Sequence, residues 1–179
     1  MAQEPIRKIM LPSHAECIAE AANYWAWIEL EVHWMLWELA DVHPNIGACF
    51  TAQMYTFTAK VDGLLALMRI RGVSQPIVDR VNKFSQSSRE ASDLRNRFVH
   101  DAWLIDNHDP AMMGRVTLNA RRKLDFITES VAAEALQKDL GPIALAQQTI
   151  TAIRKDLIAE LPSLPKIPRG GPHPLDDIR

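Results

Sequence analysis

An arginine, an asparagine and a histidine lie close together in the polar stretch that runs from residue 94 to residue 103. Asn96 directly follows Arg95, and His100 comes five residues after the arginine. Histidine has an ordinary pKa of about 6.5, so its ring can both take and give a proton near neutral pH. Arginine keeps its charge and presents a planar fork of N–H donors that matches phosphate oxygens. Together these residue types are suited to acid–base chemistry on a phosphate ester.

The spacing of the three residues decides whether one helix can bring them together. At about 100° per residue, Asn96 and His100 lie about 40° apart on one face, so their side chains can touch. Arg95 lies about 140° from His100 and projects near the apolar stripe. Both residues therefore serve one site only if the helix is distorted or a second subunit completes the pocket. A guanidinium near the core also requires an anion, either a carboxylate or a bound phosphate.

The order Arg95-Asn96 followed by His100, near the end of a predicted helix, resembles the R-x4-6-H motif of the HEPN superfamily. The resemblance covers ten residues closely and the helical architecture loosely. Many HEPN proteins are similar to metal-independent endoribonucleases that dimerise with their motifs facing each other across a cleft. The resemblance implies that His100 is the general acid or base, that Arg95 binds the scissile phosphate, and that Asn96 orients His100 or the phosphate. HEPN toxins often carry a tyrosine two residues after the histidine, where this chain has Ala102.

The resemblance also implies partners. These are RNA, a second copy of the chain meeting the first through the helix that carries the motif, and an antitoxin or a neighbouring protein in a toxin or defence setting. No cofactor is expected. Arg97, Arg89 and Trp103 are weaker candidates for RNA contact, with solvated arginines and a packed tryptophan as the alternatives.

Two other functional classes stay open. The chain can be a noncatalytic binding or interaction domain, as some HEPN domains are. It can also be a structural subunit in which Arg95 forms an ion-pair clasp with an acidic residue of the first helix, for which the candidates are Glu29, Glu31 and Glu38.

Apolar periodicity predicts an all-α fold, an up-and-down bundle of four to five helices that position the motif. The first helix is expected from a capping box at Ser13 and Glu16 to about residue 41, with its tryptophans in the core. The next two are expected over 48–71, with Gly72 beyond the end, and from a cap at Ser74 to about Trp103. The last spans 131–161, kinked or split at Gly141-Pro142.

A short β-hairpin or irregular excursion is expected before the last helix, because residues 115–119 and 123–128 alternate with a period near two. The basic residues at 121–123 are interpreted either as solvent-exposed charges in a turn or as a basic edge that guides an RNA backbone. The domain is therefore predicted over 1–161. The tail, 162–179, carries five of the prolines and is expected to be flexible.

The composition narrows the class of protein. A net charge of -2 and a pI near 6.3 argue against binding nucleic acid through bulk charge. Neither a signal peptide nor an apolar run of membrane-spanning length is evident, so a cytoplasmic protein is expected. Cys17 and Cys49 are predicted to be reduced core residues. The spacings of His14, His33 and His43 match no metal-site pattern, so no metal is predicted.

Overall fold

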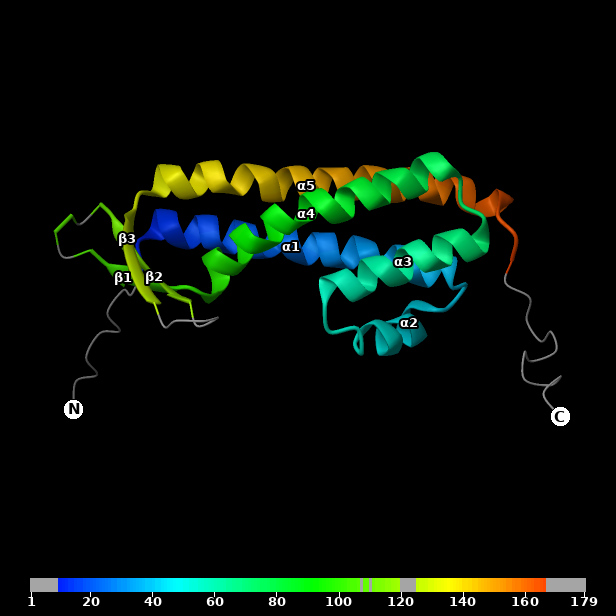
Figure 1. Cartoon of the computed structure of the whole chain (residues 1–179), viewed down its shortest axis with the longest axis horizontal. Coiled ribbons are helices and arrows are strands. Elements are labelled where there is room, and N and C mark those ends of the chain that lie inside the picture. Colours follow the sequence, from blue (N-terminus) through cyan, green and yellow to red (C-terminus); the bar gives the residue numbers. More distant parts are fainter. Residues whose placement is uncertain (1–9, 107, 110, 120–124, 167–179) are drawn as a thin grey trace. The chain divides into compact units, whose positions relative to one another are not determined.

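The structure, a computed structural model, describes residues 10–106, 108–109, 111–119 and 125–166. Within these residues the chain is mainly helical, as the periodicity predicted, and it carries a small antiparallel sheet between its last two long helices. Figure 1 labels the elements. The helices are α1 (Pro12–Leu39), α2 (Pro44–Thr51), α3 (Phe57–Arg71), α4 (Gln75–His100) and α5 (Ala133–Glu160), with a short 3-10 helix, η1 (Leu161–Ser163). The strands are β1 (Ala102–Ile105), β2 (Met113–Asn119) and β3 (Asp125–Val131).

The chain forms two compact units. Unit 1 comprises residues 1–28 and 86–149, and unit 2 comprises residues 29–85 and 150–179. The motif and the whole sheet belong to unit 1, whereas α2 and α3 belong to unit 2. The long helices α1, α4 and α5 each contribute residues to both units.

Unit 1 has its own apolar interior. Residues from α1, α4, the sheet and α5 supply it, which explains why each of these elements carries a stripe of apolar side chains. The buried hydrophobic residues of unit 1 include Cys17, Ala21, Trp25, Ile28, Ala91, Phe98, Trp103, Met113, Val131, Leu136, Leu140 and Ile143.

The sheet has the strand order β1-β2-β3, with both pairs antiparallel. Trp103 lies opposite Arg115, and Arg115 lies opposite Glu129, so these three side chains form one row across the sheet. Because side chains alternate between the two faces of a strand, Met113 and Thr117 share the face of Arg115. Met113 is fully buried, which identifies this face as the one turned toward the interior of unit 1. The predicted hairpin corresponds to β2 and β3, and β1 was not predicted as a third strand.

Three predicted helix boundaries were wrong. The helix expected over 48–71 is two helices, because Thr56 caps a new start by accepting a hydrogen bond from the backbone N–H of Ala59. The first helix begins at Pro12, so Ser13 lies inside it. The helix expected to reach Trp103 ends at His100, where the chain turns into β1.

The ends of α3 and α5 give two further outcomes. Gly72 closes α3 in a left-handed conformation, with φ of 68°, as predicted. Of the two alternatives predicted at Gly141-Pro142, a kink or a split, the split was wrong, since α5 runs through this site as a single helix. Leu140 and Ile143 are buried on either side, and their packing outweighs the one backbone hydrogen bond that the proline removes. Beyond Leu164, which is buried, residues 167–179 of the predicted tail lie outside the described residues.

Candidate functional site

Arg95, Asn96 and His100 form a polar cluster at the C-terminal end of α4, within unit 1. Nη1 of Arg95 donates a hydrogen bond to Oδ1 of Asn96 over 2.9 Å. The same nitrogen lies 3.5 Å from Nε2 of His100. Asn96 and His100 are exposed and Arg95 is half-buried, so the cluster is open to solvent along one side. A guanidinium and an imidazole therefore meet within a single chain.

The ideal-helix angles did not predict this contact. They separate Arg95 from His100 and place Asn96 nearest to His100, whereas the hydrogen bond to the histidine comes from Arg95. The long arginine side chain crosses the angular gap because its charged group lies several bonds from the helix axis. Neither a distorted helix nor a second subunit is needed for the two groups to touch.

Trp25 of α1 supports the guanidinium of Arg95. The guanidinium carbon lies 5.8 Å from the centroid of the Trp25 ring, within the range of a cation–π interaction. Nε of Arg95 is buried and has no hydrogen-bond partner in the described part of the chain. The indole is 3% exposed, so a core side chain lies beside the guanidinium whose Nη1 faces Asn96 and His100.

The predicted clasp between Arg95 and an acidic residue of the first helix is wrong for the three carboxylates proposed. Glu29 forms an ion pair with Lys60 over 3.8 Å. Glu31 and Glu38 both pair with Arg154, at 3.4 Å and 3.0 Å. Arg95 has no acidic partner among the residues that the structure describes, so its charge remains available to an anion from solution.

The end of α4 is closed by groups from the residues that follow it. The backbone N–H of Asp101 donates to the carbonyl oxygen of Arg97 over 3.3 Å. The indole N–H of Trp103 donates to the carbonyl oxygen of Phe98 over 3.1 Å. Carbonyls in the last turn of a helix have no partner within the helix, so these two bonds cap the turn that carries His100.

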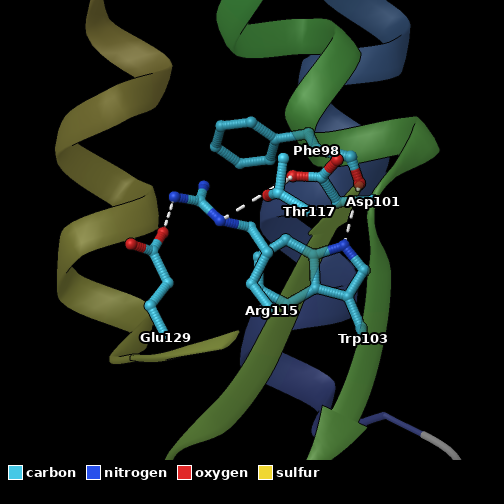
Figure 2. Close-up of polar contacts among 6 residues, drawn as sticks. All are labelled: Phe98, Asp101, Trp103, Arg115, Thr117 and Glu129. Atoms are coloured by element: carbon cyan, nitrogen blue, oxygen red, sulfur yellow. Dashed lines mark hydrogen bonds and ion pairs between the residues drawn. The ribbon is translucent and has the colours of Figure 1, made fainter. Parts of the chain in front are cut away.

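Asp101 is also held from the sheet, as Figure 2 shows. The hydroxyl of Thr117 donates to Oδ2 of Asp101 over 2.7 Å, and Nε of Arg115 lies 3.9 Å from the same oxygen. The other end of the Arg115 guanidinium forms an ion pair with Glu129. The side chains of Arg115 and Asp101 are 11% and 14% exposed, so this pair is largely buried, whereas the side chain of Glu129 is 46% exposed.

Sequence reasoning missed this network. Arg115 and Thr117 were predicted only as members of the alternating pattern at 115–119, and no role was predicted for Asp101. The alternation itself was the signal available, because it places Arg115 and Thr117 on one face of a strand. What the pattern does not give is the register that sets this strand beside the end of α4.

The other arginines and the tryptophan proposed for RNA contact lie in different surroundings. Arg89 and Arg97 are exposed on α4, where they and Gln86, Glu90, Asp93 and Leu94 line a shallow polar depression. Trp103 is 7% exposed and is occupied by its bond to Phe98 and by Arg115, 5.9 Å over its ring. Its face is not available to stack on a base. The basic run at 121–123 lies outside the described residues.

The cysteines and three histidines have separate roles. Cys17 is buried as predicted, and burial is the main cause that raises the pKa of its thiol. Cys49 is exposed, so its prediction as a core residue was wrong. His14 is fully buried with Nε2 2.9 Å from the carbonyl oxygen of Val131. His33 stacks on Trp37, and His43 caps α2 by accepting from the backbone N–H of Asn45.

Comparison of the chain with family models, with curated proteins and with solved structures gives no match. Among the described helices, none combines the length and apolar character that crossing a bilayer requires. The functional argument therefore rests on the geometry of the cluster at the end of α4.

Proposed function

We propose that Arg95, Asn96 and His100 cleave RNA without a metal ion. The observation that carries the proposal is the 3.5 Å separation between Nη1 of Arg95 and Nε2 of His100 at an exposed helix end. Two groups this close can contact the same phosphodiester, one as a cation and the other as an acid or base. The absence of an acidic partner for Arg95 among the described residues supports the same proposal, because no carboxylate competes with phosphate oxygens for the guanidinium.

The chemistry follows from the protonation of the histidine. An imidazole nitrogen that carries no proton is the form that acts as a base. His100 removes the proton of a ribose 2′-hydroxyl, and the 2′-oxygen then forms a bond to the adjacent phosphorus. The bond from phosphorus to the 5′-oxygen breaks, which leaves a 2′,3′-cyclic phosphate and a 5′-hydroxyl that has taken up a proton. Arg95 stabilises the charge that develops on the phosphate oxygens.

The proposal includes the finer features that the resemblance to HEPN proteins implies. These are an up-and-down bundle, a homodimer that meets along α4, and a toxin or defence role with an antitoxin or neighbouring protein as partner. In such a dimer, His100 of the second copy would protonate the leaving oxygen. Val99 is 40% exposed beside the motif, so Val99→Glu should shift the mass measured by light scattering from dimer to monomer.

Cleavage of labelled RNA in the presence of EDTA tests the proposal. We expect cyclic-phosphate products from the wild-type chain, no cleavage of the matching 2′-deoxy substrate, and loss of at least about 100-fold in rate for His100→Ala and Arg95→Ala. Arg95→Ala should unfold with nearly the wild-type free energy, since no carboxylate is left unpaired. Absence of cleavage across varied RNAs would leave the noncatalytic binding domain as the better account.

Stability separates the proposal from the structural-subunit alternative. A buried ion-pair clasp at Arg95 would make Arg95→Ala cost about 3–5 kcal/mol, because the partner charge would be stranded. Urea unfolding of Arg95→Ala beside Arg97→Ala, which removes an exposed arginine two residues away, measures the difference directly.

A further inference from the structure

His100 occupies a place in the chain where its direction is not fixed by the helix alone. It is the last residue of α4, and the chain leaves the helix at Asp101. The last turn of a helix frays unless its carbonyls find partners. The direction of the imidazole therefore depends on what holds the residues directly after it.

Asp101 is held from two sides of the fold. Its backbone N–H bonds to α4 through the carbonyl oxygen of Arg97, and its carboxylate accepts from Thr117 of β2 over 2.7 Å. Arg115 approaches the same carboxylate oxygen to 3.9 Å. The residue next to His100 is thus tied both to the helix and to the sheet.

The sheet residues that hold Asp101 are themselves fixed. Arg115 lies between Trp103 and Glu129 in the row across the three strands, with its guanidinium paired to Glu129. The indole N–H of Trp103 in turn donates a hydrogen bond to the carbonyl oxygen of Phe98 in α4. The contacts form a closed loop from the helix end through β1 and β2 and back to the helix (Figure 2).

Helix capping alone does not require this arrangement. An exposed helix end is satisfied by water, and a largely buried ion pair adds little net stability because removing its charges from water is costly. A network of this kind contributes most by fixing one geometry. The geometry fixed here is that of the residue adjoining His100.

We infer that Asp101 is a positioning residue for His100, held in place by Thr117 and Arg115, so that the sheet sets the imidazole against Arg95. The inference rests on the proposed function for its consequence in cleavage. Its second consequence, a fixed direction of the His100 imidazole in the free protein, does not depend on that function and can be measured without RNA.

Thr117→Val and Thr117→Ser form a matched test. Valine has nearly the shape of threonine and a high strand propensity, so the sheet should fold, but the hydroxyl that bonds Asp101 is lost. Serine keeps the hydroxyl. Ser130→Ala is the control, because it removes another hydroxyl of the same sheet, one that bonds Asp106 over 2.5 Å and not Asp101.

We expect Thr117→Val to lower kcat for RNA cleavage by roughly tenfold with KM within twofold of wild type, because misplacing one catalytic group affects the transition state more than binding. Thr117→Ser should restore kcat, and Ser130→Ala should leave it unchanged. In the free protein, the His100 ring resonances in a ¹H–¹³C NMR spectrum should move in Thr117→Val alone. If all three variants have the wild-type kcat and the wild-type chemical shifts of the His100 ring, the inference is overturned.

The two proposals fail in different ways. If the wild-type chain does not cleave RNA, the proposed function fails, and the NMR comparison still decides whether Asp101 orients His100. If the wild-type chain cleaves RNA and Thr117→Val cleaves it equally well with unmoved His100 resonances, the positioning role fails and the function stands.

Discussion

The guanidinium of Arg95 lies over the ring of Trp25, with 5.8 Å between the guanidinium carbon and the ring centroid. Trp25 is 3% exposed and belongs to the part of α1 that lies in unit 1. A core tryptophan thus serves as the platform for a charged group whose other side is open to solvent. The arrangement ties the geometry of the candidate site to the packing beneath it.

This platform gives the first prediction. Trp25→Phe keeps an aromatic face and should retain most of the RNA cleavage, whereas Trp25→Leu removes the cation–π contact and should reduce it by about tenfold. Both variants shrink a core side chain and should lose about 1–3 kcal/mol of unfolding free energy. Cleavage rates compared at a temperature where both are folded isolate the platform. Equal rates in the two variants would show that packing alone, and not the aromatic face, matters.

A second prediction concerns the charge cluster of unit 2. Arg154 pairs with Glu31 and Glu38 and lies 4.4 Å over the ring of Trp34. The side chain of Glu31 is 7% exposed, so Arg154→Met should strand a buried carboxylate and cost about 3 kcal/mol.

The matched control for Arg154→Met is Arg80→Gln. Arg80 pairs with Asp156 in the same unit, but both side chains are at least 41% exposed, so its loss should cost less than about 1 kcal/mol. Urea denaturation of the two variants measures the contrast. Similar losses in both would mean that Glu31 finds another partner or takes up a proton.

A third prediction compares two glycines of unit 2. A Cβ at Gly47 would clash with the rigid Trp37 ring, whereas a Cβ at Gly63 would come nearest to the flexible end of Met54, at 2.9 Å, with Leu36 in ordinary contact at 3.8 Å. Both positions lie within helices, where alanine is favoured over glycine by about 0.5–1 kcal/mol. Gly47→Ala should therefore destabilise the protein by about 2 kcal/mol, and Gly63→Ala should be neutral or stabilising. Thermal unfolding of both variants tests the prediction, and equal melting temperatures would contradict it.

A fourth prediction uses the pH dependence of stability. Burial, with a further contribution from Lys60, lowers the pKa of His33, and its Nε2 has no hydrogen-bond partner in the described part of the chain. Because the folded pKa lies below the unfolded value of about 6.5, the unfolded state binds more protons as pH falls through that value. The contribution of His33 to the unfolding free energy should be fully present above pH 6.5. Below that pH the unfolding free energy should decline, by at most about 1.4 kcal/mol per pH unit from this one group.

Comparison with His33→Phe checks the fourth prediction. The variant keeps an aromatic ring beside Trp37 but cannot take up a proton, so the wild-type chain should lose more unfolding free energy than the variant between pH 7 and pH 5. A parallel decline in the wild type and His33→Phe would assign the pH dependence to other groups.

Much of the fold was predictable because long helices repeat their apolar residues over many turns. The extents of α1 and α5 to within about two residues, the start of α4 near Pro76 and the β2–β3 hairpin follow from local patterns. The break between α2 and α3 was missed because apolar spacing continues across it while a single hydroxyl, that of Thr56, sets the new start. Strand β1 was missed because its four residues extend the apolar pattern of α4 and are defined only by pairing with β2.

The candidate site was predictable in its residue types and not in its contacts. Arg95, Asn96 and His100 were chosen because they form one short motif. The contact of Arg95 with His100 depends on the reach of a flexible side chain, which backbone angles do not describe. The hold on Asp101 depends on residues 14 and 16 positions later in the chain, and only the pairing of β1 with β2 brings them near.

The division into two units has a consequence for biosynthesis. The boundaries fall between residues 28 and 29, 85 and 86, and 149 and 150, all of them inside long helices. No single cut of the gene therefore yields either unit as a continuous fragment. During translation, unit 1 lacks its share of α5 until residue 149 has been added, so the motif, which ends at His100, is synthesised well before its own unit is complete.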